Sequence, residues 1–117
     1  MSKSIVLDKS KEFAIRIINL CKLLQCERHE FIMTKQIMRS GTSIGANISE
    51  AEFAISKKDF HAKMYIALKE SVETMYWLEL LVRTNYITQK EYESINNDCL
   101  ELKKMLLSIT KTTKETK

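Results

Sequence analysis

The sequence predicts an all-α protein folded as an antiparallel up-down-up-down four-helix bundle. Its 117 residues contain only 2 Gly and no Pro, whereas β-sandwiches and barrels need turn residues about every 8 to 12 positions. Apolar residues recur at helical spacing in four successive segments, and the polar breaks between these segments are short. Short connections join antiparallel neighbours, which favours a bundle made of one domain.

The first helix is expected over about residues 8–25. A stripe of apolar residues, spaced four, three and four positions apart, predicts one buried face: Phe13, Ile17, Leu20 and Leu24. The polar stretch at residues 27–30 then interrupts the pattern and predicts a turn between helices.

The second helix is expected over about residues 31–55 and contains both glycines, Gly41 and Gly45. Each glycine inside a helix costs about 1 kcal/mol relative to alanine, and a loop is the competing interpretation. Continuing apolar periodicity favours the helix. Two glycines four residues apart leave a smooth groove for a neighbouring helix. Beside this groove, Asn47 and Glu50 lie on or next to a face that is expected to be buried. If they are buried, each should have a hydrogen-bond partner in a neighbouring helix or subunit, and the alternative is a contact with a ligand.

The third helix is expected from the N-cap Ser56 to about residue 85, and the fourth begins with a capping box at Thr88 and Glu91. The third helix carries more apolar surface than one core face needs, Trp77 included. This surface and the glycine groove of the second helix together predict burial against other copies of the chain. We expect residues 1–110 to form the bundle and the Thr- and Lys-rich residues 111–117 to fray.

No catalytic residue, metal site or cofactor is predicted, so we expect a protein that is not an enzyme. Two glycines are too few for a dinucleotide-binding fingerprint. Cys26 and His29 have a spacing found among zinc ligands, but no second pair lies nearby. No Glu precedes a His by three residues, as di-iron bundles require.

The sequence contains no apolar run of the roughly 20 residues that a membrane helix needs, and its first residues do not resemble a signal peptide. Its 3 cysteines are an odd number, which favours free thiols in a reducing compartment. We therefore expect a cytoplasmic protein that does not associate with membranes.

The net charge of +4 permits nucleic-acid binding without requiring it. The candidate phosphate-binding residues are basic side chains distributed over the first three helices: Arg16, Lys22, Arg39, Lys57, Lys58 and Lys63. Lys57 and Lys58 open a helix, where free backbone N–H groups also favour phosphate. The alternative is a solvated surface, because acidic residues are interspersed among them.

The stretch Ser40–Ala51 resembles the bacterial family named for intervening sequences of 23S rRNA. The similarity continues at Ser56–Phe60, Ile66–Ser71 and Tyr76–Leu78, and upstream at Ser10–Arg16. The resemblance implies a small cytoplasmic bundle assembled as a homopentameric ring, and it supplies no catalytic set. A similar group, the accessory proteins of diversity-generating retroelements, binds nucleic acid and a reverse transcriptase.

Two hypotheses follow. The first is a non-enzymatic oligomer that binds RNA, DNA or a ribonucleoprotein through basic residues repeated around the ring. The second is a protein-interaction scaffold without nucleic-acid binding. Packing and oligomer contacts are expected at five residues: Gly41, Gly45, Asn47, Glu50 and Trp77.

Overall fold

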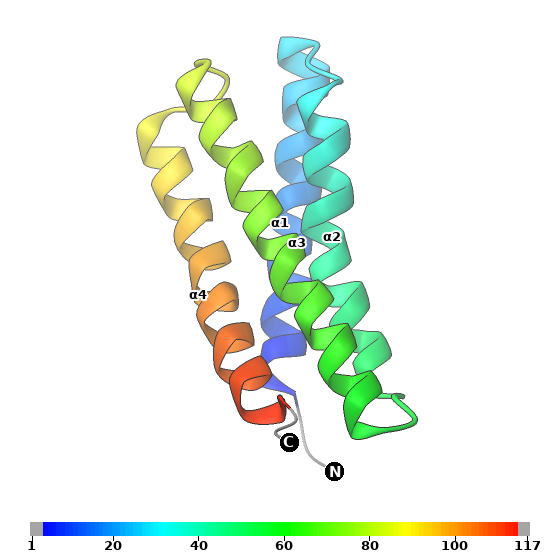
Figure 1. Ribbon diagram of the computed structural model, residues 1–117. Helices are drawn as coiled ribbons and strands as arrows, with labels where there is room; N and C mark the ends of the chain where they lie inside the picture. The colour runs from blue at the N-terminus through cyan, green and yellow to red at the C-terminus, as the bar shows by residue number, and fades with distance from the viewer. Residues whose placement is uncertain (1–3, 115–117) are drawn as a thin grey trace.

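The structure, a computed structural model, describes residues 4–114 as an all-α fold (Figure 1). Its four helices are α1 (Ile5–Arg28), α2 (Met33–Ala51), α3 (Lys57–Arg83) and α4 (Gln89–Thr113). Each helix runs antiparallel to the one before it, in a bundle 49 Å long and 23 Å across. The expected number and order of helices are confirmed.

The turn between α1 and α2 depends on a buried carboxylate. α1 ends where His29 adopts a left-handed conformation with φ of 52°. The Glu30 carboxylate then accepts hydrogen bonds from the backbone N–H groups of Ile32, Met33 and Thr34, at 3.1, 2.9 and 2.8 Å. These donors have no partner inside α2, because the first N–H groups of a helix are unpaired. Glu30 therefore acts as the cap of α2.

α1 begins at Ile5 rather than near residue 8, because the Ser4 side chain accepts from the Leu7 backbone N–H at 3.1 Å. The starts of α3 and α4 have the caps expected from the sequence. The Ser56 side chain accepts from the Asp59 backbone N–H at 3.0 Å. At the start of α4, Thr88 and Glu91 each bind the other's backbone N–H, at 3.1 and 2.8 Å, which completes the predicted capping box.

The core consists of the apolar stripes of all four helices. On α1 the residues Phe13, Ile17 and Leu24 are buried, as the spacing predicts. Leu20 is only half-buried, because it lies on the side of α1 that faces α4. α2 and α3 are joined by a buried polar contact as well, in which Thr74 Oγ1 lies 2.9 Å from Ser40 Oγ.

The glycine groove of α2 is occupied by α1 of the same chain. A Cβ atom at Gly41 would lie 2.9 Å from Ile17 Cγ2, and one at Gly45 would lie 2.8 Å from Ser10 Oγ. Both distances are too short for real atoms. The helix through the glycines is confirmed, but the expectation that this groove faces another copy of the chain is wrong.

Two predicted boundaries also need correction. α2 ends at Ala51, so Phe53 and Ile55 lie in the connection to α3 and are 85% and 93% exposed. At the other end of the chain, α4 continues through Thr113 rather than fraying from residue 111, because Thr110 is buried and extends the apolar stripe by one more turn. The rest of the expected tail, residues 115–117, lies outside the described residues.

α1 and α4 form the sparsest of the four contacts between neighbouring helices. Ion pairs cross the surface of this seam. Lys9 Nζ lies 3.1 Å from Glu101 Oε2, and Arg16 Nη1 lies 2.8 Å from Asp98 Oδ2. Shallow hollows line both ends of the seam.

No helix within residues 4–114 combines the length and apolar character needed to cross a bilayer.

We predict that Gly41→Ala destabilises the bundle through its contact with Ile17. Overpacking a tight helix contact costs about 1–3 kcal/mol, which exceeds the gain of about 1 kcal/mol from helix propensity. In an Ile17→Ala background the neighbouring Cγ atoms are gone, so the same substitution should become neutral or stabilising. Urea denaturation followed by circular dichroism measures both effects. An equal effect of Gly41→Ala in the two backgrounds would contradict the close approach.

Candidate nucleic-acid interface

Three of the six basic residues predicted to bind phosphate are paired with carboxylates across helix interfaces. Arg16 pairs with Asp98 of α4, Lys63 Nζ lies 2.9 Å from Glu50 Oε1 of α2, and Arg39 pairs with two glutamates of α3. An ammonium or guanidinium that already contacts a carboxylate has less of its charge available to a phosphate. These three residues therefore connect helices.

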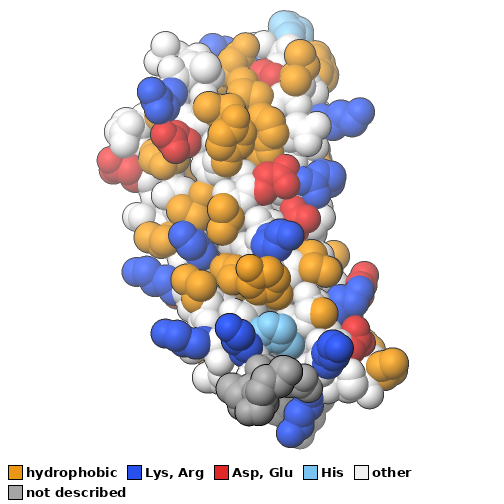
Figure 2. All heavy atoms as spheres, viewed as in Figure 1, with side chains coloured by type: hydrophobic (Ala, Val, Ile, Leu, Met, Phe, Trp, Pro, Cys, Tyr) orange, Lys and Arg blue, Asp and Glu red, His pale blue; other side chains and the backbone are white. Residues whose placement is uncertain are grey.

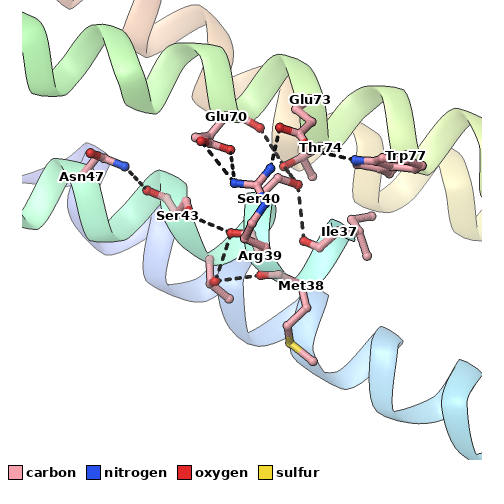
Figure 3. Close-up of polar contacts among 11 residues, drawn as sticks. Ile37, Met38, Arg39, Ser40, Ser43, Asn47, Glu70, Glu73, Thr74 and Trp77 are labelled. Atoms are coloured by element: carbon pink, nitrogen blue, oxygen red, sulfur yellow. Dashed lines mark hydrogen bonds and ion pairs between the residues drawn. The ribbon is translucent and has the colours of Figure 1, made fainter. Parts of the chain in front are cut away.

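Arg39 is the centre of the polar network between α2 and α3 (Figure 3). Its guanidinium donates to Glu70 Oε1 at 3.2 Å and also pairs with Glu73, whose other oxygen accepts from Trp77 Nε1 at 3.0 Å. The hydrogen bond from Arg39, followed by that from Trp77, lowers the pKa of Glu73. The hydrogen bond to Glu73 raises the pKa of Arg39 in turn. This network therefore holds α2 against α3.

The other three predicted residues, Lys22, Lys57 and Lys58, are exposed and form no ion pair within residues 4–114. Lys22 lies near the end of α1, whereas Lys57 and Lys58 begin α3 at the opposite end of the bundle. The six residues therefore do not form one patch.

Lys111 and Lys114, which were not among the predicted residues, lie at the same end of the bundle as Lys57 and Lys58. The start of α3 meets the end of α4 there, and His61 Nδ1 lies 2.9 Å from Thr113 Oγ1. Figure 2 shows lysine and arginine side chains around the lower end of this face, with a histidine among them. We call these four lysines the lysine end. Lys111 and Lys114 were not predicted because residues 111–117 were expected to fray, and a frayed segment presents no fixed surface.

A groove of about 900 Å³ lies between α3 and α4 beside the lysine end. Lys111, Lys114, His61 and Tyr65 contribute charged and aromatic side chains to its lining, and no Asp or Glu of the described residues lines it. Its apolar lining comes from both helices: Ala62, Ile66, Leu68 and Leu107. The arrangement offers positive charge next to an apolar, aromatic surface.

The remaining residues predicted to form packing or oligomer contacts are less buried than expected. Glu50 is exposed and pairs with Lys63, and Asn47 is half-buried and donates to the Ser43 carbonyl one turn back at 2.9 Å. Both residues lie away from the face of α2 that packs on α1. Trp77 is half-buried against the core, with its ring edge-on to Tyr76 at 5.0 Å. Each of them has a partner within the chain.

The thiols are separated and offer no common site. Cys21 and Cys99 are buried and Cys26 is exposed. Burial raises the pKa of both Cys21 and Cys99 to about 12. Within the described part of the chain, no three side chains of His, Cys, Asp or Glu are grouped closely enough to hold a metal ion.

The family model described as 23S rRNA-intervening sequence protein matches residues 2–108. The chain belongs to this family. Its fold is also similar to a crystal structure from Bacteroides thetaiotaomicron, described as a protein with unknown function from the S23 ribosomal protein family. The two chains are 64% identical with a TM-score of 0.90, and the match covers 92% of this chain and 99% of that one. No curated protein matches the chain.

Membership confirms the resemblance seen in the sequence and supports the four-helix fold. The stretch Ser40–Ala51, on which the resemblance rested, forms most of α2. Its small residues Ser40, Gly41 and Gly45 are explained by contacts with α3 and α1 of the same chain. For this 23S rRNA-intervening sequence protein, the motif therefore describes how the bundle packs.

We predict that Glu73→Gln lowers stability at neutral pH but has little effect in acid. The pKa of Glu73 is lower in the folded protein than its usual value of 4.5, so its contribution is present above that pH and is lost as the pH falls further. The side chain is partly exposed, so the loss at pH 7 should stay below about 1 kcal/mol. Thermal unfolding of both proteins between pH 3 and 7 measures the difference. Glu93→Gln, on the exposed face of α4, controls for the loss of one negative charge.

We also predict that a water-soluble disulfide reagent modifies one thiol of the folded protein at pH 8 and three after unfolding. Only Cys26 is exposed, while Cys21 and Cys99 are buried and remain protonated at that pH. Cys26→Ser should abolish the reaction of the folded protein. Rapid reaction of a second thiol would show that the core opens readily.

Proposed function

We propose that the protein is a non-enzymatic, self-associating bundle that binds the phosphate backbone of RNA or DNA through the lysine end. The observation that carries this proposal is the contrast among its basic residues. Arg16, Arg39 and Lys63 are held in ion pairs, whereas the four lysines of the lysine end form none within residues 4–114. Unpaired cations grouped at one end of a bundle are suited to neutralising phosphates.

The local charge supports the same proposal. Among residues 4–114, the lining of the groove next to these lysines includes no carboxylate. The acid at the start of α3, Asp59, accepts a hydrogen bond from the Ile55 backbone N–H at 3.2 Å. An anionic ligand in the groove would therefore contact lysines and no carboxylate of the described lining.

Self-association is proposed from the apolar surface of α3. Val72 and Tyr76, which lie four residues apart beyond the lysine end, are 48% and 55% exposed, as expected for a helix with more apolar surface than its own core needs. Exposed apolar residues grouped on one helix commonly mark a protein interface. Repeating the lysine end around an oligomer would strengthen weak phosphate contacts by avidity.

The wording of the comparisons agrees with an RNA ligand. The name of the family refers to 23S rRNA, and the protein of the related crystal structure is assigned to the S23 ribosomal protein family. Neither description states what these proteins bind. The proposal of nucleic-acid binding therefore depends on the unpaired lysines of the lysine end, and the family descriptions add support for RNA.

A protein-interaction scaffold is the second candidate function. It is favoured by the large apolar side chains that protrude from the ends of α2, which are 57% to 93% exposed: Phe31, Ile32, Phe53 and Ile55. These residues lie outside the lysine end and contribute nothing to phosphate binding. Under this hypothesis they contact another protein, and the lysines serve solubility.

The nucleic-acid proposal predicts salt-dependent binding that requires the lysine end. Fluorescence anisotropy of labelled structured RNA and duplex DNA should show binding at low salt that weakens as salt increases. Replacing Lys57, Lys58, Lys111 and Lys114 in pairs by Glu should lower the affinity and reduce the slope of log K against log salt by about 1 for each phosphate that is no longer bound. Light scattering on the same samples measures the oligomeric mass.

The matched control is Lys22→Glu with Lys35→Glu. Both lysines are exposed, belong to the opposite end of the bundle and form no ion pair within residues 4–114, so the change in net charge equals that of one lysine-end pair. Binding should survive this control. Equal loss in the control and in the lysine-end variants would mean that only net charge matters. No binding at low salt would favour the scaffold.

A further inference from the structure

The groove between α3 and α4 carries an aromatic side chain that phosphate binding alone does not require. Tyr65 is 50% exposed in the middle of this face. Its ring lies nearly parallel to that of His61, with an interplanar angle of 16° and 6.2 Å between centroids. Since His61 is also hydrogen-bonded to Thr113 at 2.9 Å, one side of the Tyr65 ring is backed by a side chain held in place.

Tyr65 lies between two hollows that share part of their lining. The larger, of about 900 Å³, leads toward Lys111 and Lys114, and the smaller, of about 380 Å³, leads along α3 and α4 toward Lys69 and Lys103. Both are lined by Tyr65, together with Leu68 and Leu107. Positive charge is therefore available on both sides of the aromatic ring along the groove.

The one acid beside the smaller hollow is already engaged. Glu73 is paired with Arg39 and accepts a hydrogen bond from Trp77. Along the apolar bottom of the groove, lysines lie on both sides of the Tyr65 ring. This order matches that of a single nucleic-acid strand, in which each base is flanked by two phosphates. In a duplex the bases are stacked on each other and are not available to a protein ring, whereas an unpaired base has a free face.

We propose that the α3–α4 groove binds single-stranded RNA or DNA, with an unpaired base stacked on Tyr65 and the adjacent phosphates at Lys111 and Lys114 on one side and Lys69 and Lys103 on the other. This inference rests on the proposed nucleic-acid function and narrows its ligand to a single strand.

The test uses the full chain and a fluorescent single-stranded oligonucleotide that contains 2-aminopurine, with a duplex of the same sequence as competitor. Binding should quench the 2-aminopurine signal, and the single strand should bind more tightly than the duplex. Tyr65→Ala should weaken single-strand binding about 5- to 150-fold, the range expected for loss of one stacked base. The salt dependence should not change, because the lysines that bind phosphate are all retained.

Two variants separate stacking from other effects. Tyr65→Phe keeps the ring and should retain both affinity and quenching. Phe31→Ala removes another exposed aromatic side chain, which lies outside both hollows, and should leave binding unchanged. Circular dichroism confirms that each variant keeps its helix content.

The outcomes distinguish this inference from the proposed function. If duplex binds as tightly as single strand and Tyr65→Ala changes neither affinity nor quenching, the groove inference is wrong while phosphate binding by the lysine end stands. If no nucleic acid binds at low salt, both are wrong, and a protein ligand for this groove becomes the better explanation.

Discussion

The close approach of α1 and α2 at the two glycines is the constraint on which the rest of the bundle depends. Ile17 and Ser10 occupy the space that side chains at Gly41 and Gly45 would need, so the two helices can pack only with their backbones near each other. This contact directs the remaining faces of α2 toward α3. Ser40 then meets Thr74, and Arg39 reaches the carboxylates of Glu70 and Glu73. The helix propensity lost at two glycines is offset by this packing.

The same geometry decides which charges are available to a ligand. Arg16, Arg39 and Lys63 lie opposite acids on a neighbouring helix, and they join the helices together. The four lysines of the lysine end form no such pair within residues 4–114. The position of a basic residue relative to the acids of the facing helix therefore decides whether its charge is paired. The small net charge of +4 conceals an end that is locally basic.

Much of the fold could be predicted from the sequence, because each helix has an apolar period and the starts of α3 and α4 carry recognisable capping signals. The cap supplied by Glu30 could not, since a glutamate three residues before the first residue of the helix is not a standard capping pattern. The candidate site is harder to predict. Sequence spacing identifies basic residues but not the acids that face them across helices, which is why Arg39 and Lys63 are among the predicted residues. Tyr65 and Lys111 belong to different helices, and only the antiparallel packing of α3 and α4 brings them to one groove.

The sparse contact between α1 and α4 makes the bundle unequal around its circumference. Helices pack closely along three sides, while on the fourth side fewer residues approach each other and ion pairs cross the surface. Such pairs weaken as ionic strength rises, whereas apolar packing does not. We therefore expect the native state to open first between α1 and α4, with α4 moving away from α1 while it stays packed against α3. We expect α1 and α2 to stay packed together at the two glycines during that motion, so that the first half of the chain remains assembled.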